Sequence, residues 1–286
     1  MTASAPITLA LPKGRMFSSV VTLLAQAGLV VREYERSYRP KADDPRLELK
    51  ILKPQNIPAL VELGRHDLGF SGYDWIVETG VAVETLDDLE LDPVDLVAAA
   101  ADAWQPPGAG APLLVVASEY EHISRRFLQD KGWAFRFVRS YGATEVFPPE
   151  DADLIVDNAA TGQTLKQNGL KIVERLMRSS TRFIASPISL RRPEVRQLAE
   201  DLVLLMRGVR AAASRVMLEM NVANGNLDEV IRLLPAMKSP TVSLLADGSH
   251  VLKAAVPQSE VPRLVPRLKQ LGASDILEYP IRKVIP

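Results

Sequence analysis

The most informative stretch of the chain, residues 153–165, reads DLIVDNAATGQTL. The aliphatic residues before Asp157 predict a buried strand, and the small and hydroxyl residues after it predict a loop. A helix is expected to begin near Thr164, so free backbone N–H groups and the positive end of the helix would face one space. A space lined in this way suits a phosphate group.

Two carboxylates on this strand, Asp153 and Asp157, lie four residues apart. Because side chains alternate between the faces of a strand, both are expected on the same face, where they could hold neighbouring ribose hydroxyls. The alternative is an ordinary turn after Asp157 with a simple helix start at Thr161-Gly162, and spacing alone leaves both open. The glycine patterns of the P-loop and of dinucleotide-binding folds are missing, which excludes those nucleotide motifs.

The length of 286 residues favours about two domains, or three if one of them is small. Hydrophobic residues make up 47% and charged residues 24%, which is typical of a globular protein and disfavours disorder or coiled coil. The 34 basic and 35 acidic residues leave a net charge of -1 and no general attraction to nucleic acid or anionic membrane. The chain has no cysteine, which excludes disulfides, thiolate nucleophiles and zinc fingers.

The N-terminus has no basic segment before its first apolar residues, unlike a secretory signal. No uncharged apolar run approaches the ~18 residues that a membrane helix needs. We therefore expect a cytoplasmic protein with neither a membrane nor a nucleic acid as partner.

Strand and helix patterns alternate along the N-terminal part, which is typical of an α/β domain with a largely parallel sheet. Strands are predicted over residues 7–11, 47–52 and 67–71, and helices over residues 17–27 and 57–63. The acidic run from Asp87 to Asp95 is interpreted as a solvated connection. Residues 103–112 are rich in proline, glycine and alanine, so a domain boundary is expected near residues 95–110.

A second α/β segment follows this boundary. Strands are predicted over residues 113–117, 134–138, 154–156 and 182–186, and a helix over residues 122–131. A long helical pattern over residues 193–215 could return the chain to the first domain.

The C-terminal part shows the order strand, helix, strand, strand, helix, strand, which is the ferredoxin-like arrangement. These elements are predicted over residues 216–222, 227–234, 241–246, 251–256, 261–271 and 276–284. Asp247-Gly248 predicts a hairpin turn because such a turn needs positive φ. Pro266 lies inside the last predicted helix, where a proline is unfavourable.

Three motifs in order resemble the ATP phosphoribosyltransferases that open histidine biosynthesis, in their long form. Residues 161–165 (TGQTL) with residues 168–170 (NGL) are similar to the family's loop for 5-phosphoribosyl 1-diphosphate (PRPP). Residues 9–15 (LALPKGR) resemble its opening motif, and residues 67–74 (DLGFSGYD) resemble its second motif. The resemblance covers essentially the whole chain.

The resemblance implies an α/β catalytic body with two lobes, like the type II periplasmic-binding-protein fold, and a C-terminal ferredoxin-like (ACT-like) α+β regulatory domain. Lobe I would span residues 1–95 and be completed by about residues 185–212. Lobe II, with the PRPP loop, would span residues 96–184, and the regulatory domain residues 213–286.

The implied reaction transfers phosphoribosyl from PRPP to N1 of the adenine of ATP and releases pyrophosphate, with Mg²⁺ present. By resemblance, Asp153 and Asp157 act in catalysis, and the motif assigns neither of them to the metal. PRPP would contact Asp153, Asp157, Asn158, Ala159, Ala160, Thr161, Gly162, Gln163 and Thr164. ATP would contact Lys13, Gly14, Arg15, Lys53, Gly72 and Asp74.

The resemblance also implies that histidine inhibits the enzyme from the C-terminal domain and that the chain forms a homo-oligomer, from dimer to hexamer. Histidine would contact Asn221, Ser239, Thr241, Ala273 and Ser274.

Two positions depart from the family pattern. Lys53 stands where an arginine is common, which exchanges a bidentate fork for a point charge. Ala160 stands where a hydroxyl residue is usual, which removes one side-chain donor to phosphate.

Two alternatives to this enzyme remain. An intracellular solute-binding or effector domain of the same fold would need neither the phosphate loop nor turnover. A type I phosphoribosyltransferase has a similar loop but lacks the Lys13-Gly14-Arg15 and C-terminal segments.

Overall fold

The structure is a computed structural model that describes residues 5–33, 37–108, 110–237 and 239–285. The chain divides into two compact units. The first unit comprises the chain up to residue 25 and residues 29–201, and the second comprises residues 26–28 and the chain from residue 202 onward.

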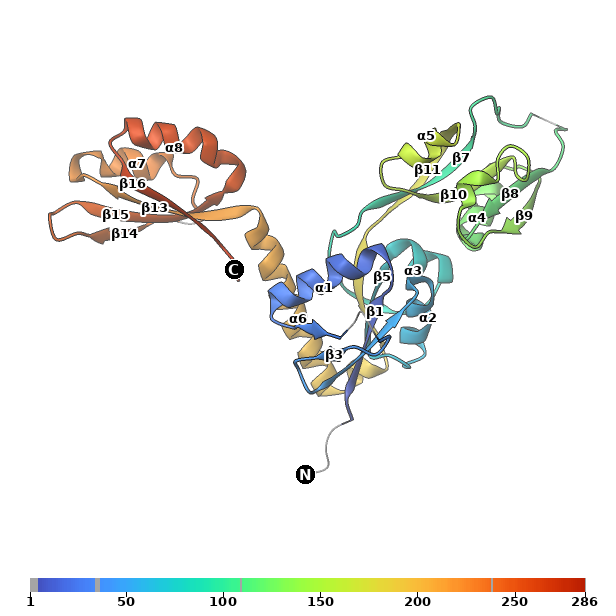
Figure 1. The fold of residues 1–286 in the computed structure, drawn as a ribbon, viewed down its shortest axis with the longest axis horizontal. Coiled ribbons are helices and arrows are strands. Elements are labelled where there is room, and N and C mark those ends of the chain that lie inside the picture. Colours follow the sequence, from blue (N-terminus) through green and yellow to red (C-terminus); the bar gives the residue numbers. More distant parts are fainter. Residues whose placement is uncertain (1–4, 34–36, 109, 238, 286) are drawn as a thin grey trace. The chain divides into compact units, whose positions relative to one another are not determined.

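One five-stranded sheet of the first unit, of which Figure 1 labels β1 and β5, has the order β4-β1-β5-β12-β6. Strand β1 pairs in parallel with β4 and β5, whereas β12 is antiparallel to β5 and β6. Leu9, Ala10 and Leu11 are fully buried, because β1 has neighbours on both sides and side chains packed on both faces. The strands are β1 (Ile7–Pro12), β4 (Leu47–Leu52), β5 (Leu68–Gly72), β6 (Glu84–Asp88) and β12 (Thr181–Ala185).

Helices, a turn and a small ribbon connect β1, β4, β5 and β6. The helices are α1 (Arg15–Ala27), α2 (Ile57–Glu62) and α3 (Tyr73–Thr79), with a 3-10 turn η1 (Pro54–Asn56) and a ribbon of β2 (Val31–Arg32) and β3 (Lys41–Ala42). The strands and helices predicted in this part are confirmed with small shifts at their ends.

A second five-stranded sheet of the first unit has the order β11-β7-β10-β8-β9. Its strands are β7 (Val94–Ala101), β8 (Leu114–Ser118), β9 (Phe135–Arg139), β10 (Leu154–Ala159) and β11 (Leu170–Ser179). The helices are α4 (Glu121–Asp130) and α5 (Gln163–Gln167), with a 3-10 turn η2 (Thr144–Val146). The chain crosses between the two sheets after β6 and again after β11.

The interpretation of residues 87–95 as a solvated connection is wrong. These residues cover the end of β6 and the start of β7, and Asp87 is buried. Asp88 accepts a hydrogen bond of 2.7 Å from the Ser180 hydroxyl and pairs with Arg182. Acidic side chains are tolerated here because polar and basic partners on neighbouring strands compensate them.

The second unit contains most of α6 (Pro193–Ala213) and a four-stranded antiparallel sheet of order β14-β15-β13-β16. Its other elements are β13 (Arg215–Val222), α7 (Leu227–Leu233), β14 (Thr241–Leu244), β15 (His250–Pro257), α8 (Val261–Gln270) and β16 (Ser274–Pro280). This order confirms the predicted ferredoxin-like arrangement.

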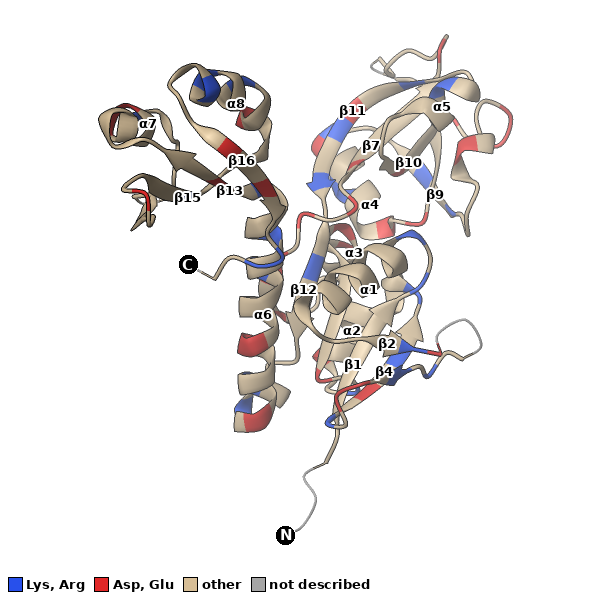
Figure 2. Ribbon diagram, turned by 60° about the vertical axis from the view of Figure 1, so that its left-hand side comes forward, with Lys and Arg blue, Asp and Glu red and all other residues tan. Residues whose placement is uncertain are grey.

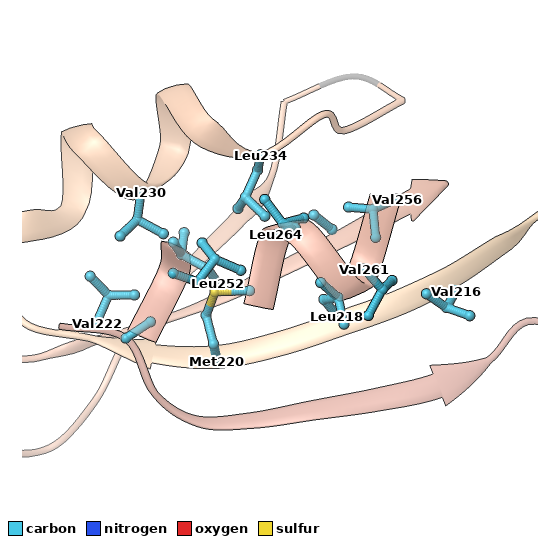
Figure 3. Close-up of a cluster of buried hydrophobic side chains, with 13 residues drawn as sticks. Val216, Leu218, Met220, Val222, Val230, Leu234, Leu252, Val256, Val261 and Leu264 are labelled. Carbon is cyan, nitrogen blue, oxygen red and sulfur yellow. The ribbon is translucent and has the colours of Figure 1, made fainter. Parts of the chain in front are cut away.

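The core of the second unit lies between its sheet and its helices (Figure 3). Val216, Leu218 and Met220 alternate along β13 and face Val230 of α7 and Leu264 of α8. The period of two on β13 therefore explains which face of the sheet is covered.

Charged residues of both signs occur in both units (Figure 2), in keeping with the net charge of -1. No helix within the described ranges is both long and apolar enough to cross a membrane.

Candidate functional site

The predicted phosphate loop follows β10 and leads into α5. Ala159 before the loop and Leu165 after it are buried in one hydrophobic cluster, so both ends of the loop are held by packing. Gly162 has a φ of 72°, a conformation that glycine adopts without steric cost. The loop is therefore a tight bend of defined shape.

Three successive backbone N–H groups of this loop are free of protein acceptors. Among the described residues, none accepts a hydrogen bond from the N–H of Ala160, Thr161 or Gly162. Helix α5 has only five residues, so its dipole is small and the loop amides are the main donors to an anion. The alanine at position 160 removes a side-chain donor but keeps its backbone N–H.

These amides border a cavity of about 470 Å³, within the size range of small-molecule sites. The loop and β10 form one side of the cavity. Segments that follow strands of both sheets form the rest. The lining residues are Arg15, Pro54, Gln55, Trp75, Glu119, Tyr120, residues 142–145 and residues 157–165. The structure thus brings together eight of the nine residues predicted for PRPP, all except Asp153.

Asp157 faces this first cavity from β10. The pKa of its carboxyl is raised to about 6, mainly by burial and to a smaller extent by the nearby carboxylates of Glu145 and Glu119, while the N–H of Asn158 acts to lower it. The group therefore changes charge close to neutral pH, as is common for functional carboxylates.

Asp153 lies elsewhere. It precedes β10, is exposed, and its Oδ2 accepts a hydrogen bond of 2.7 Å from the N–H of Val115. Four extended residues span roughly 13 Å, so Asp153 and Asp157 lie at opposite ends of the strand. The structure does not bring the two carboxylates together.

A second cavity of about 250 Å³ adjoins the turn after β1. Four of the six residues predicted for ATP line it, namely Lys13, Arg15, Gly72 and Asp74. Gly14 shapes the turn with a φ of 83°, and Lys53 is exposed before η1; neither lines the two cavities. The lysine-for-arginine departure therefore lies outside both cavities.

A buried hydrogen-bonded cluster supports the wall between the cavities. Asp74 accepts hydrogen bonds of 2.6 Å from the hydroxyls of Tyr120 and Ser179, and Asn158 donates to the Tyr120 oxygen at 3.3 Å. Burial and the Asp74 charge raise the pKa of Tyr120, so it remains a neutral phenol. The Trp75 ring stacks on Tyr120 at 4.3 Å between centroids.

Both cavities share Arg15, Pro54, Trp75, Tyr120 and Asn158 in their linings. Two ligands bound in them would therefore be neighbours. A cation, two aromatic rings and an amide at their common boundary suit a pair of phosphate-bearing substrates, one of which carries a planar base.

Among the lining residues that sequence reasoning missed are Gln55, Trp75, Glu119, Tyr120 and Glu145. Glu119 and Tyr120 directly follow β8, and polar residues after a predicted strand are a usable signal because ligands bind at such ends. Glu145 has no such signal, since it lies in the turn η2 that only the packing of the second sheet brings to the cavity.

The residues predicted for histidine fall into two groups. Asn221 donates to Asp275 at 2.9 Å, and Ser274 donates to the same carboxylate at 3.1 Å. Ser239 and Thr241 are exposed near the start of β14, at the opposite edge of the sheet from β16. Within one chain the structure does not bring them together, and Ala273 is buried in the core.

Comparisons with known proteins agree with one another. Residues 53–207 match the family HisG, described as ATP phosphoribosyltransferase, and residues 212–283 match the HisG C-terminal domain. An ATP phosphoribosyltransferase of Pelotomaculum thermopropionicum is 37% identical, with 98% of this chain and 99% of that protein covered. One of Chlorobium phaeovibrioides is 36% identical, with 98% and 97% covered.

A solved structure supports the same family. The ATP phosphoribosyl transferase (HisG:HisZ) complex from Thermotoga maritima has a chain with a TM-score of 0.62 and 28% identity, covering 70% of this chain and 98% of that one. The sequence matches include the Lys13-Gly14-Arg15 and C-terminal segments, which the type I alternative lacks. The protein is thus a phosphoribosyltransferase, and the chain belongs to the ATP phosphoribosyltransferase family.

Proposed function

We propose that this protein transfers the phosphoribosyl group of PRPP to N1 of the adenine of ATP. The bond from N1 to the ribose C1 forms, the bond from C1 to the pyrophosphate oxygen breaks, and its electron pair leaves with pyrophosphate. Family membership supports a place at the first step of histidine biosynthesis. The observation that carries the proposal is the row of free amides from Ala160 to Gly162 beside Asp157 in the first cavity.

The first cavity suits PRPP. The loop amides would hold the 5-phosphate as hydrogen-bond donors that need no rearrangement. Asp157 would accept a hydrogen bond from a ribose hydroxyl and stabilise the positive charge that develops at C1 as the leaving group departs. Both roles require the carboxylate form, so its raised pKa sets the acid limit of activity.

The second cavity suits ATP. Adenine N1 already carries a lone pair, so the reaction needs no protein nucleophile and no base to activate one. Lys13 and Arg15 would attract the phosphates, and the wall shared by the cavities would bring the adenine next to C1. Catalysis would then come from positioning and charge.

The first cavity also fits Mg²⁺ as part of a complex with PRPP. Asp157, Glu119 and Glu145 line it, although no group of three acidic or histidine ligands in the described chain forms a metal site alone. Mg²⁺ is usually held by one or two carboxylates together with substrate phosphates. Asp157 and Glu145 would hold it here, and when bound it would neutralise charge on the leaving pyrophosphate.

The C-terminal unit suits a regulatory ligand such as histidine. Asp275, held by Asn221 and Ser274, offers a carboxylate to an α-ammonium group. Ser239 and Thr241 at the other edge of the sheet would reach the same ligand only from another copy of the chain. This division supports a homo-oligomer in which histidine binds between copies and inhibits.

One assay tests the reaction. Protein, ATP, PRPP and Mg²⁺ are mixed and pyrophosphate is measured, with each substrate omitted in turn as control. We expect release only when both substrates are present, and less of it when histidine is added. No release from folded protein that still binds ATP would contradict the proposal and favour the binding domain without turnover.

A further inference from the structure

A tyrosine outside the sequence motifs contacts the lysine of the second cavity. The Lys13 ammonium donates a hydrogen bond of 2.7 Å to the Tyr38 hydroxyl, and it also lies 5.0 Å from the centre of the same ring. Lys13 follows β1 and lines the cavity, whereas Tyr38 belongs to the segment between β2 and β3.

The backbone holds both residues at one place. The N–H of Lys13 donates to the carbonyl of Leu52 at 2.7 Å, and the carbonyl of Tyr38 accepts from the N–H of Ile51 at 2.8 Å. Ile51 and Leu52 are the last two residues of β4. The ammonium and the phenol therefore meet because the ends of their segments are bonded to one strand.

The partner that Lys13 has here is neutral. Among the described residues, no carboxylate forms an ion pair with Lys13, and an ammonium has three N–H donors, of which the phenol oxygen takes one. A carboxylate in this place would cancel the positive charge. The phenol instead restricts the direction of the ammonium and leaves its charge and two donors for an anion.

Packing in the core does not explain why a tyrosine stands at position 38. Its side chain is 60% exposed, and its hydroxyl hydrogen has no acceptor among the described residues. The hydrogen bond from Lys13 and its positive charge lower the pKa of Tyr38, which is what a direct interaction of the two groups requires.

We propose that Tyr38 is a positioning residue, which holds the Lys13 ammonium toward a phosphate group bound in the second cavity. The phosphate belongs either to ATP or to the leaving pyrophosphate, and that assignment rests on the proposed function. Tyr38 acts through Lys13. It restrains the exposed Lys13 side chain before a phosphate binds, so that less rotamer entropy is lost on binding.

A first measurement tests the pairing without any substrate. In an ultraviolet titration of the tyrosines, Tyr38 should ionise at a lower pH than an ordinary exposed tyrosine. Tyr38→Phe identifies its transition, and Lys13→Met should move that transition upward. A transition that does not move in Lys13→Met would overturn the pairing and with it the proposal.

A second measurement tests the positioning role. ATP and pyrophosphate are titrated separately by calorimetry into the wild type, Tyr38→Phe, Lys13→Met and the double variant. Tyr38→Phe should weaken the binding of one of the two roughly three- to tenfold, the range for one exposed hydrogen bond to a charged group. It should have no further effect in the Lys13→Met background, and the anion that responds identifies the phosphate.

Steady-state kinetics separate this role from a structural one. Tyr38→Phe should raise the KM for ATP or weaken inhibition by pyrophosphate, with the KM for PRPP and the melting temperature unchanged. Tyr279→Phe, which removes a hydroxyl from the C-terminal unit, is the matched control.

The outcomes distinguish the two proposals. Equal affinities in the wild type and Tyr38→Phe, with ATP binding intact, overturn the positioning role and leave the proposed function standing. A wild type that shows the tyrosine shift but binds neither ATP nor pyrophosphate overturns the proposed function, and the positioning role falls with it.

Discussion

Asp157 shows how one side chain can serve function at the expense of stability. Its carboxyl is charged when it acts, yet its burial on β10 favours the neutral form and raises its pKa from 3.8 to about 6. The unfolded chain ionises this group at the lower value, so its ionisation destabilises the fold progressively as the pH rises from about 4 to about 6. Above that window the cost is constant.

Asp157→Asn should therefore make the protein more stable and less active. At pH 8 we expect a gain of about 1–3 kcal/mol in the free energy of unfolding, which disappears below about pH 3, where the wild-type group is largely protonated in both states. Turnover should fall strongly, because the charge beside C1 is lost while the shape is kept. Denaturant melts at both pH values and pyrophosphate release check this.

The wild type should also lose kcat/KM for PRPP below about pH 6, tenfold per pH unit, because only the carboxylate form acts. Asp151→Asn, which changes an exposed aspartate in the turn before β10, is the control for both measurements. A variant Asp157→Asn with normal turnover would remove this residue from the mechanism.

Gly162 adopts the positive φ that forms the bend of the phosphate loop. Gly162→Ala places a Cβ at a φ of 72°, where an L-residue costs about 1 kcal/mol or more, and the strain should rotate the neighbouring amides. We expect the KM for PRPP to rise several-fold while the KM for ATP stays the same. Gly132→Ala, with a φ of 67° and open space around it, should cost similar stability without affecting PRPP, and an equal effect on both substrates at Gly162 would contradict the assignment of the loop.

At the scale of elements, α8 forms in spite of the proline inside it. Pro266 lies on the exposed face, whereas Val261, Leu264 and Leu268 are buried against the sheet. Water can hydrate the carbonyl that Pro266 leaves without a partner, and burial of the apolar stripe offsets the lost hydrogen bond. Tertiary packing of α8 thus outweighs the low helix propensity of Pro266.

Pro266→Ala should stabilise the C-terminal unit by about 1–2 kcal/mol, because it restores one helical hydrogen bond and removes a steric clash. The gain is smaller than the full proline penalty, since the unfolded chain also becomes more flexible. Thermal melts of the full chain check this, with Pro262→Ala at the start of α8 as the control that should bring no gain. A lower melting temperature for Pro266→Ala would mean that the proline at this position is needed for packing.

At the scale of the whole molecule, the two units have separate cores. Among the described residues, the C-terminal cluster consists of residues from Val216 onward, and three clusters of the first unit consist of residues from Ala10 to Ile184. The residues that line both cavities all belong to the first unit. The proposed chemistry and the proposed regulation therefore lie in different units.

A chain that ends after Ser214 should keep pyrophosphate release and lose inhibition by histidine. It keeps α6 and loses the bond of 2.8 Å from Lys283 to the carbonyl of Ala27, so a modest loss of stability is expected. Activity assays with and without histidine, together with the oligomeric mass, check this. Continued inhibition of a folded, active truncated chain would place the regulatory site elsewhere.

Local sequence patterns predicted most helices and strands of this protein. The elements that they did not predict depend on contacts with distant parts of the chain. Strand β10, its loop and Gly162 follow from the order of residue types, because a strand, a bend and a glycine turn depend on near neighbours in the chain. Strand β7 could not be predicted, since its alanine run favours a helix or a linker. Pairing with β10 and β11 on its two sides makes it a buried strand.

The same distinction holds for the candidate site. Residue order suggested a phosphate loop after Asp157, and the family resemblance assigned residues 157–164 to PRPP and Lys13, Arg15, Gly72 and Asp74 to ATP; the first set lines the first cavity and the second set lines the second. The extended backbone of β10 keeps Asp153 apart from Asp157, whereas long-range pairing brings Gln55 and Glu145 to the first cavity and Tyr38 to Lys13. A sequence pattern specifies contacts within a few residues, whereas convergence of distant segments depends on which strands pair, and that is decided by burial across the whole fold.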